Sequence, residues 1–149
     1  MNLILEKLRE KLPHLNEKIY TETDFYRICR KEKVKVFEIP LRVHIHGYYS
    51  NYRGRSYIIL NSRITEAEKL ETAFHELGHH YLHAPVAQSV FFDSQSLSNR
   101  QEIEAQAFAL LALIPLPLLR QFEENPSLLD DYPPELVGQR LKLFEICGV

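Results

Sequence analysis

The stretch "FHELGHHYLH" at residues 74–83 constrains this chain more than any other, because it places four histidines and one glutamate within ten positions. On an α-helix, residues four apart lie on one face, so His75 and His79 can turn a ring nitrogen toward the same point. The spacing His-Glu-x-x-His is typical of a zinc site. Glu76 lies one residue round the helix, where it can reach a water on that metal and suits a general base.

The other histidines make weaker ligands. His80 points about 100° away from His79 and is expected at the surface or behind the ligands. His83 continues the motif's face but lies two turns beyond its first histidine, so we expect it to support the ligands or line a cleft. His44 and His46 alternate on a predicted strand with no partner spacing, and are expected to be ordinary strand residues.

A third ligand must come from further along the chain, because zinc usually takes three protein ligands and leaves a fourth position for water. No histidine lies beyond His83, and "RQEIEAQAFALLALIP" offers two acids, Glu102 and Glu104. They lie about 200° apart round a helix, so only one can face the metal. Gln106, four residues after Glu102, can hydrogen-bond a metal-binding histidine, whereas Phe108, four after Glu104, cannot. The pattern favours Glu102 and leaves Glu104 as the alternative.

Periodicity and turn signals predict an α+β fold, with a small antiparallel sheet of about three strands packed beside the motif helix and several further helices. All 149 residues are expected to form one domain. Its predicted parts are N-terminal helices in 1–31, a sheet in 34–61 with a hairpin of 42–50 and 55–61, a helix over 65–83, a loop over 86–98, a helix over 99–114 and a helical region over 116–149.

Composition excludes several classes of protein. The net charge of −2 leaves no basic excess to meet phosphates, so a dedicated nucleic-acid binder is not expected. The N-terminal apolar run is too short for a signal peptide, and no stretch has the roughly 18 apolar residues that a membrane span needs. Cys29 and Cys147 lie far apart, as reduced buried thiols would in a cytoplasmic protein.

Two segments together resemble the ImmA/IrrE metallopeptidases, whose pattern is a strand, a helix bearing His-Glu-x-Gly-His and a helix reading Glu-x-x-Ala-Asn-x-Phe-Ala before a proline. This chain has "YIILN", "HELGHHYLH" and "EIEAQAFALLALIP" in the same order. The residues that fall in register are Glu102, Ala105, Phe108, Ala109 and Pro115. Gln106 stands where the family usually has asparagine, and no helix-turn-helix precedes the peptidase region.

The resemblance implies a minimal zincin-like domain and a zinc metalloendopeptidase that cleaves a protein partner. It makes His75, His79 and Glu102 the zinc ligands and Glu76 the catalytic base, with Gln106 supporting them. The partner would be a transcriptional repressor or an antitoxin-like regulator, such as a helix-turn-helix repressor encoded nearby, and neither nucleic acid nor membrane is expected to bind directly.

Several alternatives remain open at this point. His83, Tyr48 and Tyr132 are candidates for stabilising the oxyanion. The chain could instead be a non-catalytic zinc-containing module that grips a repressor without cleaving it. A zinc enzyme of another class, an amidase or a nuclease, is a further possibility, although the absence of a basic excess speaks against a nuclease.

Overall fold

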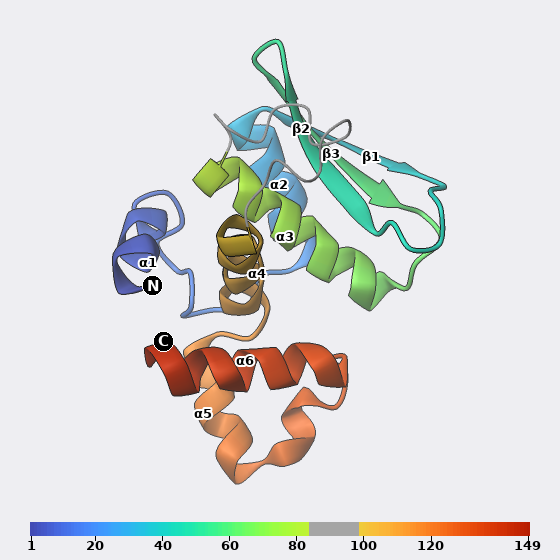
Figure 1. Cartoon of the computed structure of the whole chain (residues 1–149). Coiled ribbons are helices and arrows are strands. Elements are labelled where there is room, and N and C mark those ends of the chain that lie inside the picture. Colours follow the sequence, from blue (N-terminus) through green and yellow to red (C-terminus); the bar gives the residue numbers. More distant parts are fainter. Residues whose placement is uncertain (84–98) are drawn as a thin grey trace. The chain divides into compact units, whose positions relative to one another are not determined.

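The computed structural model describes residues 1–83 and 99–149 (Figure 1). The predicted loop over 86–98 lies outside these residues. The described parts contain the helices α1 (Asn2–Arg9), α2 (Glu22–Glu32), α3 (Glu66–His83), α4 (Asn99–Leu113), α5 (Leu116–Glu124) and α6 (Pro134–Cys147), a 3-10 helix (Pro126–Leu129), and the strands β1 (Val34–Ile39), β2 (Gly47–Tyr52) and β3 (Arg55–Asn61).

The predicted fold class is confirmed, since helices and one small sheet make an α+β fold. The helices expected over 65–83 and 99–114 are present as α3 and α4 to within a residue at either end. Contacts divide the described chain into two compact units, one of residues 1–20 with 110–149 and one within residues 21–109. That the whole chain forms one domain stays a prediction.

The sheet is mixed, and the prediction of a purely antiparallel sheet is wrong for one strand. β3 lies in the middle, antiparallel to β2 and parallel to β1. A hairpin can be predicted because its strands are neighbours in sequence, but nothing in their alternation decides which edge an earlier strand joins. Here β1 joins the free edge of β3 rather than that of β2.

Residues 42–46 were expected in a strand and instead form a turn. The buried amide of Asn61 explains this, because it takes up backbone groups that a strand would offer to a neighbour. Its Nδ2 donates to the carbonyl oxygens of Ile45 at 2.8 Å and Arg42 at 3.2 Å, and its Oδ1 accepts from the Leu41 N–H. His44 and His46 are therefore loop residues, and the prediction that they are strand residues is wrong.

The turn between β2 and β3 follows from its sequence. Arg53 and Gly54 have φ values of 52° and 76°. Two consecutive residues with positive φ make a type I′ turn, whose twist matches that of the flanking strands. Gly54 adopts this conformation without the strain that a Cβ would bring.

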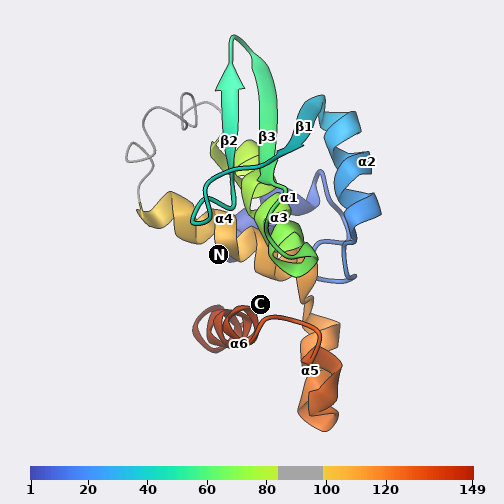
Figure 2. The ribbon, with the colours of Figure 1, turned by 90° about the vertical axis from the view of Figure 1, so that its right-hand side faces the viewer.

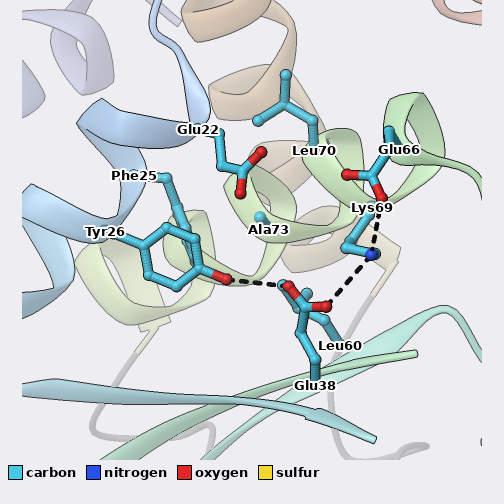
Figure 3. A pocket seen from close by; sticks show the side chains of 9 residues that line it. All are labelled: Glu22, Phe25, Tyr26, Glu38, Leu60, Glu66, Lys69, Leu70 and Ala73. Carbon is cyan, nitrogen blue, oxygen red and sulfur yellow. Dashed lines mark hydrogen bonds and ion pairs between the residues drawn. The ribbon is translucent and has the colours of Figure 1, made fainter. Parts of the chain in front are cut away.

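Both α2 and α3 pack against the same face of the sheet (Figures 1 and 2). Phe25 of α2 meets Phe74 of α3 edge to face, with ring centroids 5.7 Å apart. Glu38 of β1 turns toward both helices, where its carboxylate accepts hydrogen bonds from the Tyr26 hydroxyl at 3.0 Å and from Lys69 Nζ at 3.2 Å (Figure 3). The other face of the sheet, which is turned away from α2 and α3, is called its outer face.

Capping fixes where α3 begins. The Thr65 hydroxyl accepts the N–H of Glu68, and the Glu68 carboxylate accepts the N–H of Thr65. This reciprocal pair satisfies two of the N–H groups that a helix start leaves without partners. The start of α3 in turn sets which residues of the motif share a face.

The unit of residues 1–20 and 110–149 is held together by a buried arginine. Arg140 has no exposed surface, and its guanidinium donates to the carbonyl oxygens of Ile114 and Val149 and to Asn16 Oδ1. Burial lowers the pKa of Arg140 to about 10. Its three acceptors lie far apart in sequence, so one side chain ties distant segments of this unit.

No single described helix is long and apolar enough to cross a membrane. Among the described residues, α4 and α5 reach that length and composition only as a pair, which is bent by 64°.

Candidate metal centre

One face of α3 carries a row of three histidines. His75, His79 and His83 follow at intervals of four residues, and the centroids of successive rings lie 5.0 and 5.2 Å apart. His79 and His83 are buried, while His75 is partly exposed beside an open hollow. The spacing read from the sequence therefore produces a continuous row of imidazoles.

Glu102 of α4 meets two of these rings. One of its carboxylate oxygens lies 3.1 Å from His75 Nε2, and the other lies 3.1 Å from His79 Nε2. One ligand atom from each of the three residues lies within 4.8 Å of the other two, so that a single metal ion could be held between them. Glu104 is directed elsewhere, with its carboxylate 3.0 Å from His83 Nε2. The structure brings the favoured acid to the paired histidines and keeps the alternative acid apart.

Gly78 allows α3 and α4 to approach closely enough for this convergence. A Cβ at this position would lie 3.0 Å from the Ala105 carbonyl oxygen and 3.2 Å from Phe108 Cβ. Such contacts are tighter than side chains normally make, so a larger residue would push the helices apart. The glycine within the motif thus helps to set the distance between the histidines and Glu102.

A chain of hydrogen bonds holds the ring of His75. Its Nδ1 lies 2.7 Å from Gln106 Oε1, and Gln106 Nε2 donates to the Glu71 carboxylate at 3.0 Å. Because Glu71 can only accept, it orients the amide so that its oxygen faces the histidine. Nδ1 of His75 must then donate to the amide oxygen, so Nε2 is the nitrogen that faces Glu102. Nε2 donates to that carboxylate while the ring is protonated and offers its lone pair to a metal ion once that proton is lost.

A second chain holds the ring of His79. Its Nδ1 lies 3.0 Å from His83 Nδ1, and His83 Nε2 lies 3.0 Å from the Glu104 carboxylate. Burial lowers the pKa of His83, which favours its neutral form. A neutral His83 that donates to Glu104 must accept at Nδ1, so His79 donates from Nδ1 and turns Nε2 toward Glu102. Both histidines are thus held in the tautomer that metal binding through Nε2 requires.

The charges at the convergence point favour a cation. Burial pushes the pKa of His75 down, but the bond to Glu102 and the charge of Glu76 outweigh it and raise this pKa to about 9. The same bonds from His75 and His79 hold the pKa of Glu102 well below its ordinary value. Positive charge is therefore stabilised here, whether protons or a metal ion carry it.

Glu76 is buried beside this point. Burial raises the pKa of its carboxyl, and the neighbouring His75 and His79 and the backbone N–H of Tyr49 partly offset this rise. Glu76 and His75 line the same open hollow, of about 220 Å³. A buried carboxyl with a raised pKa, next to a space that can admit a reactant, has the properties of a general base.

His80 lies on the opposite side of α3 and takes no part in this cluster. Its Nε2 lies 3.1 Å from the Glu32 carboxylate, and its Nδ1 lies 3.0 Å from the Tyr49 hydroxyl. The side chain is only 14% exposed, so His80 is packed against the sheet rather than at the surface. Its partners come from α2 and β2, which sequence spacing could not have indicated.

The hollow also involves residues that the sequence did not single out for the site. The hollow is lined by His46, which precedes β2, by Gly47 at the start of β2 and by Glu71 and Thr72 of α3, together with His75, Glu76 and Gln106. Their contribution depends on how the sheet meets α3, and no local pattern signals it. A Cβ on Gly47 would lie 2.5 Å from the Ile59 carbonyl oxygen, so only glycine fits there.

The two tyrosines considered for an oxyanion role lie differently. The Tyr49 side chain faces α3, so the alternation of β2 turns Tyr48 to the outer face of the sheet, away from the histidines. Tyr132 belongs to the other unit, where its hydroxyl donates to the Leu113 carbonyl oxygen at 2.9 Å. Of the three candidates, His83 is the one whose ring contacts a residue of the cluster.

Known proteins match this chain over the region that carries the site. The family model described as the IrrE N-terminal-like domain, Peptidase_M78, matches residues 29–138. A curated relative, "Uncharacterized immunity region protein 2" of Bacillus phage phi105, is 31% identical over 116 residues, which make up 76% of this chain and 73% of the relative. No solved structure matches the chain. Because the family model covers well over half of the chain, including both site helices, the protein belongs to the ImmA/IrrE family of peptidases.

Proposed function

We propose that the protein is a zinc-dependent endopeptidase that cleaves a protein partner, either a transcriptional repressor or an antitoxin-like regulator. The observation that carries this proposal is the convergence of His75, His79 and Glu102 on one point, with Glu76 buried beside it. Membership of a peptidase family supports hydrolysis of a peptide bond as the reaction.

The donor set suits zinc. Two imidazole nitrogens and one carboxylate oxygen are the three protein ligands found in many hydrolytic zinc sites, which keep a fourth position for water or substrate. The side chains that would hold the ion are His75, His79 and Glu102, with Gln106 and His83 fixing the two rings. Zinc, when bound, supplies the Lewis acid that lowers the pKa of a water and polarises a carbonyl.

Glu76 would move the proton. Its carboxylate accepts a proton from the attacking water and then gives it to the amine of the departing peptide, so one group serves as base and as acid. Burial raises its pKa, which brings the group closer to the pH at which it must both accept and release a proton. The hollow lined by Glu76, His75 and Gly47 would admit the peptide.

The nature of the partner is inferred from the relative. The phage protein is named for an immunity region. The resemblance to the ImmA/IrrE family implies a repressor as the partner, so a helix-turn-helix repressor encoded beside this protein is the first partner to test. The name of the phage protein says nothing of cleavage, so a test of function must separate cleavage from binding.

The decisive experiment compares the parent chain with Glu76→Gln, both loaded with zinc and incubated with that repressor. The amide keeps the shape of the side chain but cannot take the proton, so we expect unchanged zinc content and a cleavage rate lower by about 10²–10⁴-fold. Mass spectrometry of the fragments measures the rate. If both chains bind the repressor and neither cleaves it, the protein is a non-catalytic zinc-containing module instead.

A further inference from the structure

The outer face of the sheet, turned away from α2 and α3, carries exposed apolar side chains. On β1, Glu38 faces the helices, so Lys35, Phe37 and Ile39 face outward (Figure 3). Phe37 is 48% exposed and Ile39 is 41% exposed. Apolar side chains of this size on a face that no described element covers are a common mark of an interaction surface.

Apolar side chains continue from β1 across the sheet, and the middle one, Ile59, is only 9% exposed. The register places Phe37 beside Ile59 of β3, and Ile59 beside Tyr48 of β2. Phe37 also stacks against Tyr57, with ring centroids 6.3 Å apart. The middle of the outer face is therefore apolar from one edge strand to the other.

Cations lie on one side of this row, toward the β2–β3 turn, and no carboxylate accompanies them on the outward positions of the strands. Residues 33–63 contain six lysines and arginines but a single acid, Glu38, although the chain as a whole carries −2. Glu38 faces the helices and is paired with Lys69. Lys35 and Arg55 are exposed on outward positions of β1 and β3. The outer face is thus both apolar and basic.

We propose that this face docks an acidic segment of the protein partner that carries apolar side chains among its carboxylates. The proposal rests on the proposed function and deepens it by naming the chemistry of the partner. Carboxylates would meet Lys35 and Arg55, while apolar side chains would cover Phe37 and Ile39. β2 carries part of this face, and its first residue, Gly47, lines the hollow, so one strand belongs both to the docking face and to the site.

A protein segment fits this face better than single-stranded nucleic acid. Nucleic acid needs open aromatic faces on which bases stack. Here Phe37 and Tyr57 face each other, and the guanidinium of Arg53 lies over the ring of Tyr52 at 5.3 Å. Ile39 adds exposed aliphatic surface, which contributes nothing to stacking.

The test uses the zinc-loaded Glu76→Gln chain, so that binding is measured without cleavage. The probe is a fluorescein-labelled extended peptide of glutamate, leucine and serine, and its control has lysine in place of glutamate. We expect the acidic peptide to bind and the basic one not to bind. Lys35→Glu with Arg55→Glu should weaken binding at least about tenfold by fluorescence anisotropy. Phe37→Ser should also weaken it, because the apolar contact is lost.

A matched control changes the same charge elsewhere. Arg120→Glu with Lys142→Glu alters two exposed cations of the other unit and should leave binding unchanged. If circular dichroism shows that the variant with Lys35→Glu and Arg55→Glu does not fold, a variant with Lys35→Gln and Arg55→Gln replaces it. We expect a smaller loss of binding affinity from this second variant. Three outcomes would overturn the proposal. The two peptides could bind equally well, the control variant could lose as much affinity as the Lys35 and Arg55 variant, or oligo-dT could displace the labelled acidic peptide at a lower concentration than unlabelled acidic peptide does.

Failure of this proposal is distinguishable from failure of the proposed function. If the acidic peptide binds but no repressor is cleaved by the parent chain, docking stands and the peptidase function falls. If the repressor is cleaved equally fast with and without the Lys35 and Arg55 reversal, at repressor concentrations below saturation, the peptidase function stands and the docking proposal is wrong.

Discussion

The two sides of α3 both place histidine beside glutamate, yet they differ in what they leave available. On one side, His75 and His79 converge on Glu102 through Nε2, while their Nδ1 atoms are held by Gln106 and His83. On the other side, His80 uses one nitrogen for Glu32 and the other for Tyr49. No ring nitrogen of His80 remains for an ion.

The comparison teaches that proximity of histidine and acid does not by itself make a metal site. The same 3.1 Å contact occurs on both sides of the helix. The difference is that the rings of His75 and His79 share the carboxylate of Glu102, beside a hollow. The Nδ1 atoms of these two rings already have hydrogen-bond partners. Each prediction below tests this difference, beginning with the largest expected effect.

Removing the shared carboxylate should have the largest effect. Glu102→Ala takes away one of three donors, so we expect zinc affinity to fall by more than the roughly 100-fold that losing a supporting residue can cost. Glu104→Ala is the matched control on the same helix, and it should keep zinc under chelation that strips Glu102→Ala. Competition with a chromophoric chelator measures both. The reverse order would make Glu104 the ligand.

The next largest loss of zinc affinity should come from breaking the hydrogen bonds that hold the rings of His75 and His79. Gln106→Ala and His83→Ala should each lower zinc affinity by about 10–100-fold, because the affected ring is no longer held with its Nε2 lone pair toward the ion. Spectra of the cobalt-substituted protein should change in both variants, since the geometry of the remaining ligands relaxes. Unaltered affinity and spectra in both variants would show that the Nδ1 contacts do not position the rings.

How far the sequence predicts this site depends on the range of each interaction. His75, Glu76 and His79 follow from helical spacing alone, and Glu102 follows from Gln106 four residues later. The pairing of Glu104 with His83, and of Gln106 with Glu71, joins residues 21 and 35 positions apart. Such contacts depend on how α3 and α4 cross, which Gly78 allows but no local pattern specifies.

The fold shows the same division. The β2–β3 hairpin and the starts of the helices follow from turn and capping residues, such as Gly54 and Thr65. Two other features cannot be predicted in this way. The parallel pairing of β1 depends on β3 lying in the middle of the sheet, and the turn over 42–46 depends on hydrogen bonds from the side-chain amide of Asn61. Sequence periodicity does not identify contacts between residues that are far apart in the chain.

A smaller effect should follow from changing the other side of α3. His80→Phe fills the same space but removes two hydrogen bonds, leaving Glu32 without its partner, so we expect about 1–2 kcal/mol lower stability. Zinc affinity should change less than about twofold, because additivity holds for sites that share no partner. Urea unfolding of the zinc-free protein and chelator competition measure the two quantities. A large loss of zinc affinity would join His80 to the metal centre.

The smallest effect concerns the cysteines. Cys29 is 2% exposed, and burial together with the nearby charge of Glu32 raises its pKa to about 12, whereas Cys147 is partly exposed. Since only the thiolate reacts, labelling of Cys29 near pH 8 should be slower than that of Cys147 by on the order of 100-fold. His80→Phe should bring the two labelling rates closer together, because α3 then packs less firmly against the sheet. Glu102→Ala should leave the ratio of the two rates unchanged. Mass spectrometry of partly labelled protein measures both rates, and equal labelling of the two cysteines in the parent chain would show that Cys29 is not protected by burial.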